Sequence, residues 1–264
     1  MNTEEFRELV WSEAKALYRD MPWRDEPSFY HVLVSEVMLQ QTQVSRALVK
    51  FAEFIEAFPS VEDLAAASLA DVLRVWNGLG YNRRAKFLWQ AAQQVVADGQ
   101  PKTAKDLQRL SGVGKNTAGA IMNYVYEVPT PFVETNIRTV YIHHFFADSF
   151  EVTDKELLTF VDSTMDAEHP RQWFWALMDY GSYLKSSHGA LLNQSRHYKK
   201  QSPLKGSVRE VRGQIIRELM KRSMSESELR EAVNADERFE SALAGLINDQ
   251  LVQHGAGSNY RLVE

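Results

Sequence analysis

A single carboxylate lies in an otherwise apolar and amide-rich stretch near the N-terminus. The run from Ser35 to Thr42 reads Ser-Glu-Val-Met-Leu-Gln-Gln-Thr, and Glu36 is its only charged residue. The apolar residues around it predict a largely buried helix. Because burial raises the pKa of a carboxyl, Glu36 could hold a proton at neutral pH and give it to a poor leaving group. The alternative is a glutamate stabilised by a helix N-terminus or by an arginine.

A second carboxylate, Glu134, comes directly before a predicted helix that begins at Thr135. An acidic residue at this place is also ordinary helix capping. Two carboxylates that converge on one site would suit cleavage of a glycosidic bond through an oxocarbenium-like state.

A glycine turn separates two predicted helices between Leu110 and Gly119. Gly112 and Gly114 stand two residues apart, and Lys115 follows them. Glycines allow unusual backbone angles and close backbone approach, and the amides of the next helix favour an anion. Phosphate binding is one interpretation, and a simple helix hairpin is the other.

A third motif places an aromatic residue among glycines and basic residues. Tyr81 follows Gly78-Leu79-Gly80 and precedes Arg83, Arg84 and Lys86. Such a group can stack on a base and contact phosphates, or it can be a helix start with a solvated basic face. Gln40 and Gln41 could fill a gap in a duplex or cap a turn.

Composition describes an ordinary globular chain of 264 residues with 44% hydrophobic and 25% charged residues. No apolar run approaches the ~20 residues of a membrane span, and the acidic N-terminus does not resemble a signal peptide. We therefore expect a cytoplasmic protein. The net charge is −5, but ten Lys or Arg residues stand against two acidic ones from Lys185 to Arg222. That segment predicts either a phosphate-facing surface or a solvated linker.

Helical spacing dominates the chain, with Ser28 and Thr103 as expected N-caps, so the predicted class is all-α. Periodicity is lost from Lys185 to Gly206, which predicts a loop and a linker. The end of the chain predicts three helices and then two strands, the order of a winged helix: Val208–Lys221, Ser225–Val233, Asp236–Asp249, Leu251–His254 and Tyr260–Val263.

Metal ligands are not evident. Cysteine is absent, which excludes disulfides and Cys-ligated zinc or iron–sulfur clusters, and the seven histidines lack a ligand spacing. We predict no catalytic metal.

Together these residues resemble the helix-hairpin-helix DNA glycosylases, and most closely the MutY-type adenine glycosylases. The resemblance runs from about Trp23 to Tyr183 and is carried by six motifs: Pro22-Trp23-Arg24, Ser35–Thr42, Trp76–Tyr81, Leu110–Gly119, Val133–Asn136 and Ala176–Gly181. It implies a two-lobed glycosylase core that flips a base out of double-stranded DNA.

The resemblance also implies roles for individual residues. Glu36 would protonate the flipped base, and Glu134 would stabilise positive charge at C1′, with Asn136 as a hydrogen-bond partner. Gln41 and Tyr81 would wedge into the stack. The base pocket would contain Asn116, Trp23 and Arg24. The expected contacts to the DNA backbone are spread over four segments: Gln40, Thr42, Arg83, Gly112, Val113, Gly114, Lys115, Thr117, Arg196, Lys199 and Lys200.

Four departures from that family change the expectations. Glu134 stands where the family has aspartate, and its extra methylene moves the carboxylate. Asn116 stands where endonuclease III relatives carry a Schiff-base lysine, which predicts a monofunctional enzyme without lyase activity. The cluster cysteines are absent, so no iron–sulfur cofactor is expected, although a monovalent cation at the hairpin is left open. The C-terminal domain that senses 8-oxoguanine in that family is not expected here, and a small winged-helix-like segment is expected in its place.

The predicted organisation is a lobe formed by residues 1–21 and 132–205, a bundle formed by 22–131, and a winged-helix-like domain at 206–264. The predicted function is base excision repair by a nucleoid-associated monomer that binds double-stranded DNA with a mismatched or damaged base and makes no membrane contact. Adenine in a mismatch is the first choice of base. Mispaired thymine or uracil, another modified base, a catalytically silent DNA-binding protein and a protein-interaction module are the alternatives.

Overall fold

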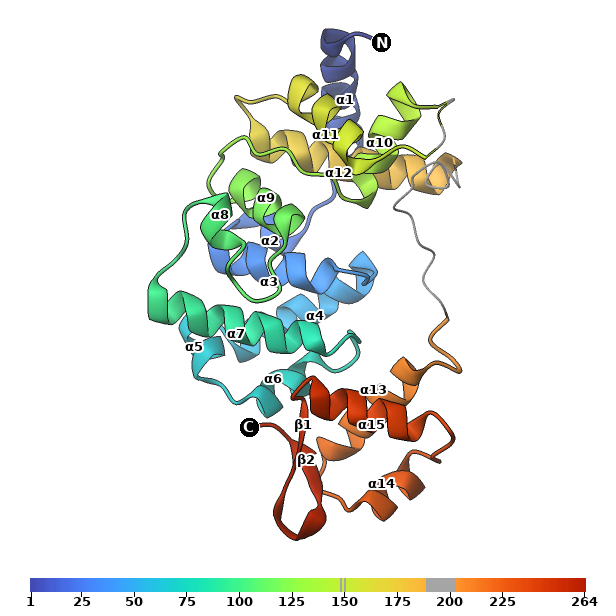
Figure 1. Ribbon diagram of the computed structural model, residues 1–264. Helices are drawn as coiled ribbons and strands as arrows, with labels where there is room; N and C mark the ends of the chain where they lie inside the picture. Colours follow the sequence, from blue (N-terminus) through green and yellow to red (C-terminus); the bar gives the residue numbers. More distant parts are fainter. Residues whose placement is uncertain (148, 150, 189–202) are drawn as a thin grey trace. The chain divides into compact units, whose positions relative to one another are not determined.

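The computed structural model describes residues 1–147, 149, 151–188 and 203–264, and helices are the main secondary structure that these residues form (Figure 1). The chain forms two compact units, each built from several segments. The first unit contains Met1–Glu36, Pro101–Arg109 and the described part of Val113–Lys200, and the second contains Val37–Gln100, Leu110–Gly112 and the described part of Gln201–Glu264. The division falls within one helix, α3 (Phe29–Leu39), directly after Glu36.

The first unit is organised around its long C-terminal helix. Besides the start of α3, its helices are α1 (Thr3–Leu17), α2 (Pro22–Asp25), α8 (Ala104–Leu107), α9 (Lys115–Tyr124), α10 (Thr135–Phe145), α11 (Asp154–Thr164) and α12 (Pro170–His188). Helix α12 packs against α1, α9 and α10. Its Trp173 and Phe174 are fully buried, as are Phe6 of α1 and Tyr141 of α10. This aromatic core fixes the helices that carry the second carboxylate.

The second unit joins the middle of the chain to its C-terminal part. Its elements are α4 (Val44–Ala57), α5 (Val61–Ala66), α6 (Leu69–Trp76), α7 (Arg83–Asp98), α13 (Val208–Leu219), α14 (Glu226–Ala232), α15 (Phe239–Asn248), β1 (Val252–His254), a short 3-10 turn (Ala256–Ser258) and β2 (Tyr260–Leu262). Helix α7 packs on α5 and α6, and α13 packs on α15.

The last elements follow the predicted order of three helices and a hairpin. Strands β1 and β2 pair in antiparallel register, with Val252 opposite Leu262 and His254 opposite Tyr260. The helical class of the fold is confirmed. The winged-helix assignment of these elements stays a prediction, as does the three-part division of the chain, because compactness does not test which segments fold independently.

Two predicted caps are present and explain where two helices begin. Ser28 Oγ accepts a hydrogen bond from the backbone N–H of His31 at 3.1 Å, at the start of α3. Thr103 Oγ1 accepts one from the N–H of Asp106 at 3.2 Å, at the start of α8. Each cap satisfies an N–H group that the helix itself leaves unpaired.

A glycine allows α12 and α10 to approach each other closely. A Cβ atom built on Gly181 would lie 2.2 Å from the carbonyl oxygen of Asn136, which no real structure tolerates. The absence of a side chain at position 181 therefore fixes the first turn of α10 against α12.

None of the helices formed by the described residues is both long enough and apolar enough to pass through a bilayer.

Candidate active site

Glu36 and Glu134 lie close enough in the first unit to influence each other's protonation. Glu36 sits in α3 between Ser35 and Val37, which are both buried. Burial, together with the smaller effect of the neighbouring negative charge of Glu134, raises the pKa of Glu36 to about 8. Glu36 is therefore a carboxyl that keeps its proton at neutral pH, as its apolar surroundings in the sequence predict.

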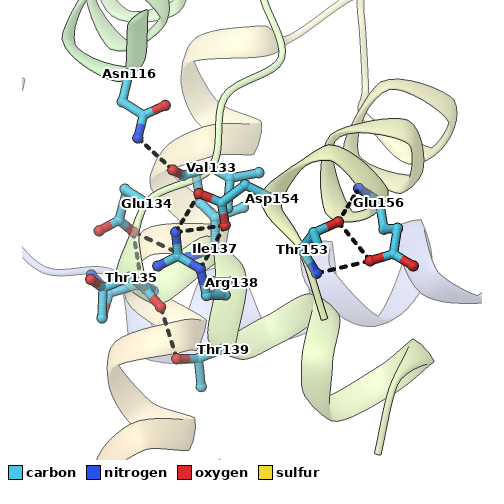
Figure 2. A network of polar contacts seen from close by, with 11 residues as sticks. Asn116, Val133, Glu134, Thr135, Ile137, Arg138, Thr139, Thr153, Asp154 and Glu156 are labelled. Atoms are coloured by element: carbon cyan, nitrogen blue, oxygen red, sulfur yellow. Dashed lines mark hydrogen bonds and ion pairs between the residues drawn. The ribbon is translucent and has the colours of Figure 1, made fainter. Parts of the chain in front are cut away.

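Glu134 is held differently, as the N-cap of α10 (Figure 2). Its Oε1 accepts hydrogen bonds from the backbone N–H groups of Asn136 at 2.6 Å and Ile137 at 3.1 Å. Burial raises the pKa of Glu134, but these two N–H groups and the positive charges of Arg138 and Lys185 oppose that rise. The pKa of both carboxyls is raised by burial, but only at Glu134 do backbone donors and nearby cations act against the rise and favour the charged form.

Asn116 and Arg138 fix the segment that carries Glu134. Asn116 Nδ2 donates to the carbonyl oxygen of Val133 at 2.6 Å, directly before Glu134 (Figure 2). Arg138 donates to the Asp154 carboxylate through Nε and Nη2 at 2.8–3.0 Å. Asn136 contacts Glu134 through its backbone N–H. The predicted role of its side chain stays a prediction.

Tyr124 belongs to this site, although the sequence reasoning did not identify it. Its hydroxyl is buried, and its pKa is raised well above the ordinary value by burial and by the charges of Glu36, Glu134 and Asp179, with Arg24 acting in the opposite direction. The sequence does contain a pattern that could have identified Tyr124: Asn116 and Tyr124 are eight residues apart in α9 and so lie on the same helix face. The phenol remains protonated beside the two carboxyls.

Trp23 and Arg24 are buried, and Arg24 is engaged with Asp179. Its Nη1 and Nη2 donate to the two carboxylate oxygens at 2.7 and 3.0 Å, and its guanidinium lies 5.2 Å from the ring centre of Trp175. This pairing links α2 to α12. The expected role of both residues in a base pocket stays a prediction.

The glycine turn has the backbone that a hairpin requires. Gly112 has φ +76°, and a Cβ there would lie 2.8 Å from Cβ of Phe87. The N–H of Ser111 is held by Gln94 Oε1 at 2.8 Å. Gly114 caps α9 without a side chain, while Lys115 and Asn116 are exposed and Val113 and Thr117 are buried. The first N–H groups of α9 are thus accessible to an anion.

In the second unit, the predicted wedge residues occupy two loops with left-handed backbone. Gln41 has φ 57° and Tyr81 has φ 47°. We call the segments Gln40–Thr42 and Leu79–Asn82 the wedge loops. Non-glycine residues rarely adopt such angles, so the surrounding structure must hold them.

Arg84 holds both wedge loops, which the sequence did not reveal. Its guanidinium donates to acceptors on each loop and on the end of α3: the carbonyl oxygens of Val37, Met38, Gln40, Leu79 and Gly80, and Thr42 Oγ1. Burial lowers its pKa to about 10, and Trp76 Nε1 also donates to the carbonyl oxygen of Gly80, at 3.1 Å. Arg84 is therefore a structural residue, whereas Arg83 is exposed and pairs with Asp249 at 3.3 Å.

Part of the predicted DNA surface lies outside the described residues, namely Arg196, Lys199 and Lys200. Within the described ranges, no group of three or more His, Cys, Asp or Glu side chains is arranged to hold a metal ion. The sequence itself contains no cysteine.

The chain is similar to a base excision DNA repair family and to curated adenine DNA glycosylases. Residues 34–162 match the family described as "HhH-GPD superfamily base excision DNA repair protein". The chain is 33% identical over 222 residues to the adenine DNA glycosylase of Mus musculus, a match that covers 78% of this chain and 42% of that protein. It is 40% identical over 136 residues to the adenine DNA glycosylase of Mycobacterium tuberculosis (strain ATCC 25618 / H37Rv), covering 50% of this chain and 44% of that protein. The matched regions span less than half the length of these curated relatives.

Solved structures share the fold. A thermostable thymine-DNA glycosylase superposes with a TM-score of 0.61 at 23% identity, covering 72% of this chain and 92% of that chain. An endonuclease III–DNA covalent intermediate superposes with a TM-score of 0.56 at 17% identity, covering 77% and 91%.

Proposed function

Because residues 34–162 match the HhH-GPD superfamily of base excision DNA repair proteins, we propose that the chain belongs to this superfamily and hydrolyses the N-glycosidic bond of a mispaired adenine in double-stranded DNA. The curated relatives at 33–40% identity are named adenine DNA glycosylases, which supports adenine as the base.

The observation that carries this proposal is the pair of unlike carboxyls. Glu36, with a pKa of about 8, holds a proton that it can donate to the departing base. Glu134 accepts two backbone N–H bonds, which stabilise its negative charge. That charge would stabilise the cation that develops at C1′ and could orient the attacking water. The protonated Tyr124 hydroxyl beside both carboxyls supplies a neutral donor to the same site.

Three features support engagement of the duplex. The hairpin presents the N-terminal amides of α9 to a phosphate, and Lys115 adds a positive charge there. The wedge loops present Gln41 and Tyr81, which would occupy the space left in the stack by the extruded nucleotide. The long basic stretch after Lys185 adds electrostatic attraction for the backbone.

A single substitution tests the proposal. Wild-type protein should release adenine from a duplex with adenine opposite guanine, which alkali would reveal as a strand break at the abasic site. Glu36→Gln removes the transferable proton while keeping the size of the side chain. It should abolish release in single-turnover assays and leave the affinity for the duplex within a few-fold.

The same assay distinguishes the alternatives. Duplexes with thymine or uracil opposite guanine serve as comparison substrates, and release of only those bases would replace adenine in the proposal. Binding without release of any base by wild-type protein would favour a catalytically silent DNA-binding protein. Release by Glu36→Gln at the wild-type rate would remove Glu36 from the mechanism.

A further inference from the structure

The C-terminal part of the chain reaches one of the wedge residues. Arg209, in α13, donates a hydrogen bond to the Tyr81 hydroxyl, and its guanidinium lies 5.2 Å from the centre of the Tyr81 ring. It also donates to the carbonyl oxygen of Pro203 at 3.4 Å. These residues all belong to the second unit. An arginine from the end of the chain thus lies against an aromatic side chain that precedes it by 128 residues.

A cavity of about 520 Å³ opens beside this contact. Its lining includes both wedge residues, Gln41 and Tyr81, and three residues of α13, Arg209, Arg212 and Gly213. The volume falls within the range of about 300–1,000 Å³ found for small-molecule sites. The wall of this cavity therefore combines a stacking surface, an amide and guanidinium donors.

Asp249 stabilises the far wall of the cavity. Its carboxylate pairs with Arg212 at 2.5 Å and with Arg83 at 3.3 Å. Its backbone carbonyl oxygen accepts from Lys86 Nζ at 2.9 Å, and Lys86 also donates to the Gln250 side chain. These bonds attach the end of α15 to α7, so the cavity has a defined shape before any ligand enters.

We propose that this cavity receives the base that remains opposite the excised one, and that Arg209 recognises that base as guanine. The inference rests on the proposed function, because wedge residues that fill the gap leave the opposite base without its partner. Four arginines line the cavity against one carboxylate. Arg83 and Arg212 pair with that carboxylate, Asp249, and Arg84 bonds the wedge loops, so Arg209 is the guanidinium we assign to a ligand that presents acceptors. Guanine presents O6 and N7 along one edge, which the planar fork of a guanidinium matches, whereas cytosine presents an amino group at the corresponding edge.

The test compares three duplexes that differ only in the base opposite adenine: guanine, 7-deazaguanine and cytosine. 7-Deazaguanine lacks only the N7 acceptor. Single-turnover rates of adenine release are measured for wild type, Arg209→Ala and Arg209→Lys, with Arg222→Ala as the matched control. Arg222→Ala removes the same charge from the C-terminal part of the chain. Arg222 pairs with Glu228 and does not line this cavity.

A bidentate contact changes base discrimination by about 5- to 150-fold, the equivalent of 1–3 kcal/mol. The rate ratio of guanine to cytosine should fall by that factor in Arg209→Ala, and Arg209→Lys should restore little of it. Wild type should be slower on 7-deazaguanine than on guanine, and Arg209→Ala should lose this difference. Arg222→Ala should keep the wild-type ratio.

Binding gives a second readout that needs no chemistry. Dissociation constants are measured for duplexes with a tetrahydrofuran abasic analogue opposite the same three bases, and the guanine preference should again depend on Arg209. Equal slowing on every duplex would show that Arg209 only positions Tyr81, and an unchanged ratio in both readouts would also overturn the proposal. If wild type releases no base from any duplex, the proposed function fails, and the binding ratios still decide whether the cavity reads guanine.

Discussion

At the scale of single residues, protonation separates the roles of the two carboxyls. Burial raises the pKa of both, but at Glu134 two backbone donors and two nearby cations act against that rise. Under the proposed function, this difference lets Glu36 serve as the acid and Glu134 as the charge stabiliser in one small site at one pH. Tyr124 completes this arrangement without adding a charge.

The first prediction concerns stability and pH. Glu36 has a pKa of about 8 in the folded protein against an ordinary value of 4.5, so the folded state binds its proton more tightly. The stabilising contribution is complete below pH 4.5 and is lost as the pH rises to about 8. Glutamine has no such loss. The stability of Glu36→Gln relative to wild type should therefore increase across this window, by roughly 1–2 kcal/mol for a side chain that keeps some solvent exposure.

Urea unfolding at pH 5 and pH 8.5 measures the difference. The control is Gln108→Glu, which compares glutamine with glutamate at an exposed position. A stability difference between wild type and Glu36→Gln that is the same at both pH values would show that the pKa of Glu36 is not raised.

The second prediction concerns Asn116, whose amide holds the Val133 carbonyl oxygen and carries no nucleophilic amine. Borohydride added during turnover should trap no covalent protein–DNA complex, and strands should break only after alkali or heat. Asn116→Lys is the informative comparison, because a new amine at this position could form a Schiff base. A trapped adduct with the wild type would assign lyase chemistry to another lysine, with exposed Lys115 the first to replace.

At the scale of elements, the close contact of α10 and α12 positions Glu134. The third prediction follows from it: Gly181→Ala should force the two helices apart, because the new Cβ would meet the Asn136 carbonyl oxygen. A loss of about 1–3 kcal/mol is expected, together with slower base release. Gly114→Ala is the control for stability, since a Cβ there meets nothing within 4 Å. Thermal unfolding of both variants checks this, and equal melting temperatures would contradict it.

Elements were largely predictable from the sequence because their signals are local. Ser28 and Thr103 cap helices where expected, and the last three helices and two strands lie close to their predicted bounds. The unpredicted parts depend on long-range contacts. The sequence predicts that Arg84 either contacts phosphates or belongs to a solvated basic face, yet it is buried and bonds two loops. No local pattern indicates that Arg209 contacts Tyr81.

At the scale of the whole molecule, the proposed function requires a chain with a net charge of −5 to bind a polyanionic ligand. Acidic partners neutralise several arginines, as Asp249 does for Arg83 and Arg212 and Asp179 does for Arg24. Other basic groups, such as Lys115 at the hairpin, are exposed. The distribution of charge, rather than its sum, decides where a phosphate backbone can bind.

The fourth prediction concerns metals, for which the sequence offers no cysteine. Neither the melting temperature nor base release should change after treatment with EDTA and gel filtration. Elemental analysis should find no stoichiometric iron or zinc. A drop in melting temperature that added zinc or iron reverses would contradict this.

The way Arg84 holds the wedge loops has a consequence for evolution. Five of its six acceptors are main-chain carbonyl oxygens, which every amino acid possesses. The hydrogen bonds that hold the loops therefore do not depend on the side chains at positions 40, 41 and 81, although the left-handed backbone at 41 and 81 disfavours β-branched residues there. Under the proposed function, substitutions at these tips would change which base the protein prefers, while the hydrogen bonds that hold the loops would stay the same.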